Sequence, residues 1–189
     1  DVERSRGLGD VYKRQSWPFV TGPRNRTMAP LHLSMQGQNM STRIDYSKAS
    51  PEAFKAFGGV HVALQNGDLS KMLIDLVFLR VSQINGCAYC IDLHSRDLLK
   101  LGMTVDKLLL VPVWHEAQSL FTAREQAALA WAESVTRVEQ TGVPQADYDA
   151  VTAEFNDKEL AELTYAISLM NAYNRLGVAF RMVPTAAKG

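Results

Sequence analysis

Both cysteines of this 189-residue chain lie in the stretch Cys87-Ala88-Tyr89-Cys90-Ile91-Asp92-Leu93-His94. On a helix of about 3.6 residues per turn, Cys87, Cys90 and His94 fall within about 60° of one another, so two sulfurs and an imidazole share one face. Asn85-Gly86 just before the stretch is a turn signal, which predicts that the helix begins at Cys87. Free N–H groups and the helix dipole at such a start favour thiolate over thiol. We interpret the stretch as a reactive dithiol.

Three other interpretations of the two cysteines have to be weighed. Free cysteines are often packed as small hydrophobic residues, although two at redox spacing beside a histidine favour chemistry over packing. A structural zinc site needs four ligands, and this chain offers one Cys-X-X-Cys, His94 and either His61 or His115. A thioredoxin-type site needs the motif next to a strand in a βαβ unit, and the sequence shows no such alternation.

Two residues are candidates to assist the thiols. His94 lies four residues after Cys90, where helical side chains meet, and an imidazole accepts a thiol proton near neutral pH. Asp75 is a carboxylate within an apolar run, which is costly unless it finds a partner. We expect His94 to be that partner. The alternative is that Asp75 faces water beside Lys71.

Composition limits the classes of function. The chain has 20 basic and 20 acidic residues, so its net charge of zero gives no general attraction to nucleic acid or anionic membranes. No apolar run approaches the ~20 residues of a membrane helix. Two cysteines at contact spacing are unlike a disulfide scaffold and fit a reducing compartment, which predicts a cytoplasmic location.

The first 39 residues differ from the rest of the chain. Arginine and lysine are scattered there among Gly, Pro, Ser and Gln without apolar periodicity, which predicts a disordered leader over 1–39. The pattern becomes regular after Met40, so the leader is interpreted either as non-native sequence or as an Arg-rich transit peptide. The domain is expected over 40–189.

Residues from Pro51 onward predict helices almost to the end. Pro51 and Thr104 mark helix starts, and Thr122-X-X-Glu125 and Asn156-X-X-Glu159 are capping boxes. The 69–85 segment is apolar almost all round, so its helix should be deeply buried. We predict an all-α fold, a compact bundle of about six to seven helices. The expected segments are 51–65, 69–85, 87–101, 104–110, 122–139, 144–155 and 156 to about 180.

The pattern Asp75-(eleven residues)-Cys87-X-X-Cys90-X-X-X-His94, within Leu79-Arg80-Val81-Ser82-Gln83-Ile84-Asn85-Gly86, resembles the AhpD-like alkylhydroperoxidases of the carboxymuconolactone decarboxylase superfamily. The likeness runs from about Met40 to Pro184 and includes Asn171-Ala172-Tyr173-Asn174-Arg175-Leu176. It implies an all-helical protein that assembles as a trimer or hexamer. It also implies that Cys90 is the peroxidatic thiol, Cys87 the resolving thiol, and His94 with Asp75 the proton relay. Asp75 and Tyr89 depart from the family, which has glutamate and histidine there.

The dithiol and the resemblance together predict a thiol peroxidase that acts on organic hydroperoxides or hydrogen peroxide. It would need no cofactor or metal, and an external dithiol, thioredoxin-like or lipoyl, would reduce it. One alternative is a non-enzymatic redox-sensing oligomer. The other is a carboxymuconolactone decarboxylase-like enzyme of aromatic degradation, a branch that lacks the Cys-X-X-Cys.

Overall fold

The computed structural model describes residues 42–187, and within that range every regular element is a helix. The predicted all-α class is therefore confirmed. The predicted leader over 1–39, and the start at Met40, lie outside the described residues. The α-helices are α1 (Tyr46–Ala49), α2 (Pro51–Gln65), α3 (Lys71–Asn85), α4 (Ala88–Lys100), α5 (Val105–Leu110), α6 (Ala123–Thr136), α7 (Val138–Thr141), α8 (Gln145–Thr152) and α9 (Asp157–Ala179), with 3-10 turns η2 (Val111–Glu116), η3 (Gln118–Leu120) and η4 (Thr185–Ala187).

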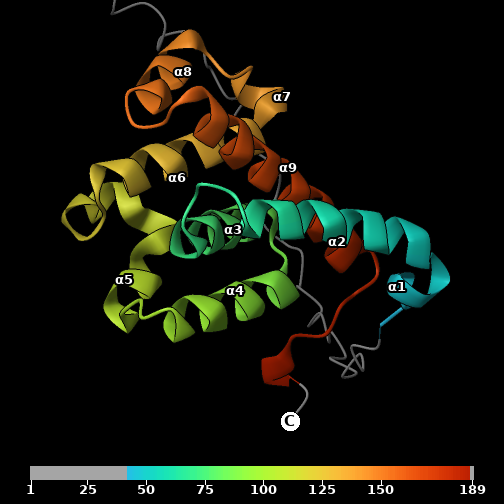
Figure 1. The fold of residues 1–189 in the computed structure, drawn as a ribbon. Coiled ribbons are helices and arrows are strands. Elements are labelled where there is room, and N and C mark those ends of the chain that lie inside the picture. Colours follow the sequence, from blue (N-terminus) through green and yellow to red (C-terminus); the bar gives the residue numbers. More distant parts are fainter. Residues whose placement is uncertain (1–41, 188–189) are drawn as a thin grey trace, which may run out of the picture. The chain divides into compact units, whose positions relative to one another are not determined.

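Helix α3 is the centre of the domain, with α4, α6 and α9 packed against it (Figure 1). Ten consecutive residues, from Leu73 to Ser82, are buried. This explains why the segment is apolar almost all round, since neighbouring helices cover most of its sides. The core divides into two clusters, and residues of α3 take part in both.

Local capping signals place the helix ends. Thr122 and Asn156 each accept a hydrogen bond from the backbone N–H three residues on, and Glu125 and Glu159 complete both capping boxes. Gly86 ends α3 in the left-handed region at φ 67°, which a residue with a side chain rarely adopts. This turn places Cys87 as the N-cap of α4.

Two predicted boundaries were wrong. The helix expected over 122–139 ends at Thr136, because Arg137 leaves helical geometry and the single turn α7 follows. The Thr141 hydroxyl donates to the Ser134 carbonyl and so satisfies one of the last free acceptors of α6. The helix expected over 144–155 is shorter, Gln145–Thr152, with Pro144 as its N-cap.

Helix α2 is the least buried of the long helices. Its contacts are mainly with α1 and α9, and Leu64 is its one buried residue. Phe54, Phe57, Val60 and Val62 are all more than a third exposed. None of the helices between residues 42 and 187 combines the length and the apolar character that crossing a bilayer requires.

Candidate active site

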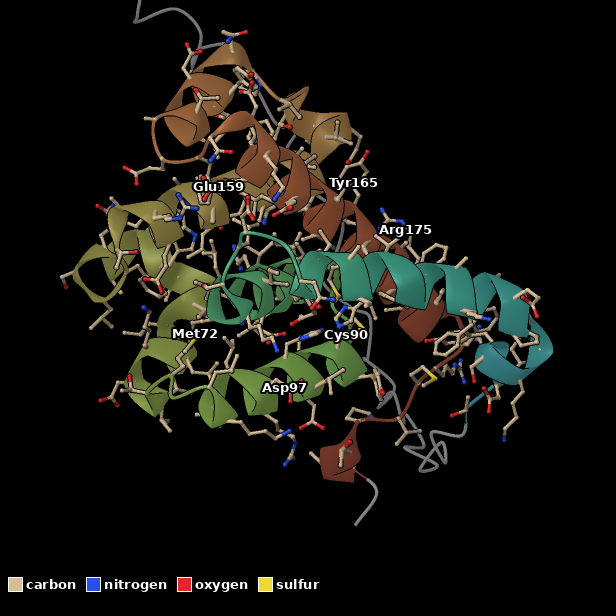
Figure 2. All side chains as sticks on the ribbon, in the orientation of Figure 1. Met72, Cys90, Asp97, Glu159, Tyr165 and Arg175 are labelled. Atoms are coloured by element: carbon tan, nitrogen blue, oxygen red, sulfur yellow. The ribbon has the colours of Figure 1, made fainter. Side chains whose placement is uncertain are left out.

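The two cysteine sulfurs lie side by side at the start of α4, with Sγ to Sγ at 2.6 Å. Cys87 is 1% exposed and Cys90 5% exposed, so both are buried in a single chain. The Cys87 N–H donates to the Ser82 carbonyl, which ties the start of α4 back to α3. Figure 2 shows Cys90 in the region where α4 lies beneath α2. The predicted dithiol geometry is thus present, with free thiols.

The environment makes the two thiols unequal. A hydrogen bond from the Cys90 thiol, and next the backbone N–H of Cys90, outweigh burial and lower the pKa of Cys87 from 9.0 to about 7. The same contact raises the pKa of Cys90, since this thiol donates to its neighbour, and burial acts in the same direction. The first proton is therefore lost from the pair near neutral pH, and the resulting charge is centred on Cys87.

Asp75 and His94 form a buried pair beside the dithiol. His94 Nδ1 lies 3.0 Å from Asp75 Oδ1, and both residues are buried. Asp75 therefore does not face water beside Lys71, and the expected partnership with His94 is present. Among the described residues, no hydrogen bond joins His94 to either thiol. The Phe78 ring packs against the imidazole at 5.0 Å.

The two other histidines considered as zinc ligands lie elsewhere. His61 of α2 stacks on Phe78 at 5.9 Å, while His115 Nε2 lies 3.4 Å from the Glu133 carboxylate. Within residues 42–187, one group of at least three possible ligands has all its ligand atoms within 4.8 Å, and it consists of Asp75, His94 and Asp97. That group contains no sulfur. The structure therefore does not assemble the cysteine-based zinc site that the sequence left open.

Helix α9 packs against the dithiol. Its residues were not assigned to the site from the sequence. A Cβ on Gly177 would lie 2.9 Å from the Cys87 sulfur, so only glycine allows this approach. Asn174 is 1% exposed and lies beside both thiols. Its Nδ2 donates to the Ser82 hydroxyl at 3.0 Å. A buried amide on the inner face of an apolar helix was the available signal.

Three tyrosines, Tyr46, Tyr89 and Tyr173, lie near the dithiol. Burial, followed by negative charge on neighbouring Tyr89 and Cys90, raises the pKa of Tyr46, and burial raises that of Tyr173. The Tyr46 and Tyr173 phenols are therefore neutral at pH 7. They come from α1 and α9, so α1, α4 and α9 all contribute to the surroundings of the sulfurs.

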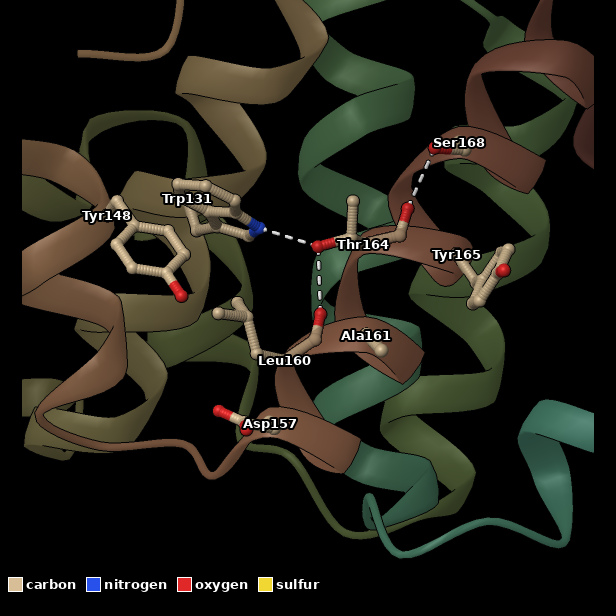
Figure 3. A pocket seen from close by; sticks show the side chains of 8 residues that line it. All are labelled: Trp131, Tyr148, Asp157, Leu160, Ala161, Thr164, Tyr165 and Ser168. Atoms are coloured by element: carbon tan, nitrogen blue, oxygen red, sulfur yellow. Dashed lines mark hydrogen bonds between the residues drawn. The ribbon is translucent and has the colours of Figure 1, made fainter. Parts of the chain in front are cut away.

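A hollow of about 450 Å³ lies apart from the dithiol, on α6, α8 and α9 (Figure 3). Two of its polar groups are paired locally, since Trp131 Nε1 donates to Thr164 Oγ1 at 3.0 Å and Thr164 donates to the Leu160 carbonyl at 2.8 Å. It contains neither cysteine nor histidine, so we do not assign the chemistry to it. Its lining residues are Trp131, Tyr148, Asp157, Leu160, Ala161, Thr164, Tyr165 and Ser168.

Comparison with known proteins places this chain among relatives that are themselves largely uncharacterised. The sequence profile of the carboxymuconolactone decarboxylase family matches residues 49–134, which include the dithiol, Asp75 and His94. The uncharacterized protein YdfG of Bacillus subtilis is 30% identical over 140 residues, covering 74% of this chain and 95% of that protein.

Solved structures agree with the sequence match. A protein of unknown function from Agrobacterium tumefaciens, for which the name antioxidant defence protein AhpD has been proposed, is 39% identical, with a TM-score of 0.74 over 76% of this chain and 98% of its own. An uncharacterized peroxidase-related protein from Ralstonia eutropha, described as an alkylhydroperoxidase AhpD core, has a TM-score of 0.65 over 74% of each chain. At 24% identity, that second likeness shows the fold alone. The chain belongs to the carboxymuconolactone decarboxylase superfamily, as an AhpD-like member.

Proposed function

We propose that this protein is a thiol peroxidase that uses the Cys87–Cys90 pair and no cofactor. The observation that carries the proposal is the contact of the two sulfurs at 2.6 Å, with the pKa of Cys87 lowered to about 7. Such a pair holds thiolate at neutral pH and can close to a disulfide with little movement. The pair also favours this activity over that of the lactone decarboxylases.

In the proposed first step, the Cys90 thiolate attacks the distal oxygen of a hydroperoxide, ROOH. The O–O bond breaks, Cys90 becomes a sulfenic acid, and the alkoxide leaves and takes up a proton to give ROH. The Cys87 thiol then attacks the Cys90 sulfur, which forms the disulfide and releases water. An external dithiol, thioredoxin-like or lipoyl, reduces the disulfide and is itself oxidised.

The greater acidity of Cys87 has to be reconciled with attack by Cys90. The sulfurs are 2.6 Å apart, so the single proton of the monoanion lies between two sulfur acceptors. Moving that proton to Cys87 leaves the thiolate on Cys90, one helical turn from His94. Asp75 bonds Nδ1 of the imidazole, which leaves Nε2 to exchange protons with the reacting groups.

Peroxide consumption under multiple turnover tests the proposal. The wild-type protein is mixed with tert-butyl hydroperoxide or hydrogen peroxide and with dithiothreitol, dihydrolipoamide or reduced thioredoxin. We expect the wild type to consume many equivalents of peroxide and Cys90→Ser to show no turnover. Without reductant, Cys87→Ser should consume one equivalent and retain a sulfenic acid at Cys90, which dimedone traps. Ser168→Ala, in the hollow of Figure 3, is the matched control and should turn over normally.

Two outcomes would change the proposal. If each reductant supports only one stoichiometric oxidation, the protein is a redox sensor, the second candidate. If dimedone labels Cys87 in the Cys90→Ser protein, the dithiol is retained but the roles of the two thiols are exchanged.

A further inference from the structure

The face of α9 that carries Asn174 and Gly177 packs against the sulfurs of Cys87 and Cys90. These residues are three positions apart, so they lie on one side of the helix. The site of a missing Cβ at Gly177 is 2.9 Å from the Cys87 sulfur and 3.7 Å from the Cys90 sulfur. The contact between the two sulfurs has the largest effect on the pKa of each thiol, and the Asn174 side chain, one turn before Gly177, lies close enough to favour the ionised form of both. Asn174 is 1% exposed, so water does not compete for its amide.

A chain of hydrogen bonds fixes which way the Asn174 amide points. The Phe78 carbonyl can only accept, so the Ser82 hydroxyl donates to it at 2.7 Å and must in turn accept. Asn174 Nδ2 therefore faces Ser82, at 3.0 Å. Its Oδ1 then faces the opposite way and accepts from Asn85 Nδ2 at 3.0 Å.

The other end of this series of hydrogen bonds requires the same orientation of the Asn174 amide. Asn171 Nδ2 donates to the Ile167 carbonyl at 3.0 Å, so its Oδ1 must accept, and it does so from Asn85 Nδ2 at 2.9 Å. Asn85 is thus a donor on this side, and Asn174 must offer it an oxygen. Both ends of the chain therefore place the N–H hydrogens of Asn174 on the side of Ser82 and the sulfurs.

One of these hydrogens is weakly held. Asn174 Nδ2 has two, and besides Ser82 its partner is the Met170 sulfur at 3.4 Å. A thioether is a weak acceptor, whereas an anionic acceptor strengthens a hydrogen bond about twofold. Among residues 42–187, no lysine or arginine forms a hydrogen bond with either cysteine. The Asn174 amide is a neutral side-chain donor that acts on both thiols, whereas the backbone N–H of Cys90 acts on Cys87.

We propose that Asn174 stabilises the thiolate of the Cys87–Cys90 pair by donating an N–H hydrogen bond to it from α9. The assignment rests on the proposed function only in that this thiolate is the reacting group. The other titratable groups facing the site are Tyr46, Tyr89 and Tyr173, together with the Asp75–His94 pair. Asp75 and His94 bond each other, and the Tyr46 and Tyr173 phenols are neutral at pH 7.

The rate of iodoacetamide alkylation between pH 5 and pH 10, followed by mass spectrometry of each cysteine, tests this role without peroxide. In the wild-type protein the midpoint for the first thiolate should lie at about pH 7. Loss of the charge-assisted bond in Asn174→Ala should raise that midpoint by about one unit, so alkylation at pH 6 falls about tenfold. Asn174→Leu removes the amide but keeps its size, and should give the same shift if the alanine variant does not melt cooperatively.

Asn171→Ala is the matched control, because Asn171 shares the helix and the bond from Asn85 but contacts neither sulfur in the structure. Its midpoint should equal that of the wild type. The proposal is overturned if a folded Asn174 variant alkylates with the wild-type midpoint, or if Asn171→Ala shifts it equally. Either result leaves the peroxidase proposal to its own turnover assay.

Discussion

At the scale of single residues, the Asp75–His94 pair determines which atom of the imidazole can take part in chemistry. The carboxylate holds Nδ1 at 3.0 Å, so the neutral tautomer carries its proton there and leaves Nε2 as the basic nitrogen. Phe78 packs against the ring and limits its rotation. The two residues are 19 positions apart, on α3 and α4, so only the packing of these helices brings them together.

Removing the imidazole should slow the first oxidation. A positioned general base contributes at least about a hundredfold, so His94→Ala should lose about that factor in single-turnover rate at pH 7. The rate should partly recover at higher pH, since hydroxide and bulk base then remove the thiol proton. Stopped-flow mixing with hydroperoxide at pH 6 to 9 measures this. His115→Ala, remote from the dithiol, is the control, and an equal loss there would contradict the assignment.

Gly177→Ala should disturb the dithiol directly. The new Cβ would lie 2.9 Å from the Cys87 sulfur, so the sulfur or α9 must move, and overpacking of this kind costs about 1–3 kcal/mol. The midpoint of chemical unfolding should fall, and Cys87 should alkylate at a changed rate. In Gly58→Ala nothing lies within 4 Å of the new Cβ. Helix α2, which contains Gly58, should therefore gain up to about 1 kcal/mol of stability. Equal destabilisation of both variants would refute the argument.

At the scale of elements, Glu133 links α3, η2 and α6. Its Oε1 accepts from Arg80 Nε and from Trp114 Nε1, each at 2.8 Å. Burial opposes ionisation, but the bond from Trp114 and the charge of Arg80 outweigh it, and the pKa of Glu133 lies below its ordinary 4.5. Because Arg80 is itself buried at 9% exposure, this carboxylate is the partner that neutralises it.

Glu133→Gln should therefore destabilise the domain by about 2 kcal/mol at pH 7. The sign of the pH dependence follows from the lowered pKa: the contribution is fully present above about pH 4.5 and is lost as the pH falls through the folded-state value. The difference between wild type and variant should accordingly shrink in urea titrations below pH 4.5. The exposed Glu116→Gln serves as the control. A pH-independent difference would assign the loss to packing.

Helix starts could be predicted from the sequence because capping is local. Thr122 with Glu125 and Asn156 with Glu159 lie three residues apart, and both boxes formed. The end of α6 was missed because a bond from the Thr141 hydroxyl, seven residues on, satisfies a carbonyl of its last turn. Such a bond depends on the path of the following turn, so no residue spacing predicts it.

The candidate site also has one part that could be predicted from the sequence and another that depends on how the helices pack. The placement of Cys87 and Cys90 follows from helical periodicity, and the pairing of Asp75 with His94 from the cost of burying a carboxylate. Asn174 could be recognised as a buried amide, but its place beside the dithiol could not be predicted, because Asn85 and Asn174 are 89 residues apart and their pairing exists only once α3 and α9 pack. Hydrophobic patterning indicates that a helix is buried, but not against which partner.

At the scale of the whole molecule, exposed apolar side chains favour the prediction that the chain forms an oligomer. Val62 on α2 is 58% exposed and Leu109 on α5 is 68% exposed. Most of the inner face of α9 is buried within the chain, and the exposed apolar residues lie mainly on α2, α4 and α5. A second copy of the chain would cover these exposed apolar side chains.

We predict a homo-oligomer, a trimer or hexamer, at micromolar concentration. Val62→Glu should shift it toward smaller species, because burying an unpaired carboxylate at an apolar contact is costly. Light scattering coupled to size-exclusion chromatography gives the mass directly. Gln145→Glu adds the same charge at an exposed polar position on α8 and should leave the mass unchanged. A monomeric wild-type protein would contradict the prediction.

The slight burial of α2 has a consequence for folding. A 15-residue helix that buries one leucine, and that carries Gly58 and Gly59 at about 1 kcal/mol each relative to alanine, has little more than the stability of a free peptide. On a lone subunit its amide hydrogens should exchange with solvent deuterium within seconds, while those of α3 exchange only on global unfolding. Docking of a second copy would protect them. Deuterium uptake in α2 should therefore fall as protein concentration rises, which would make the order of this helix a property of the assembly.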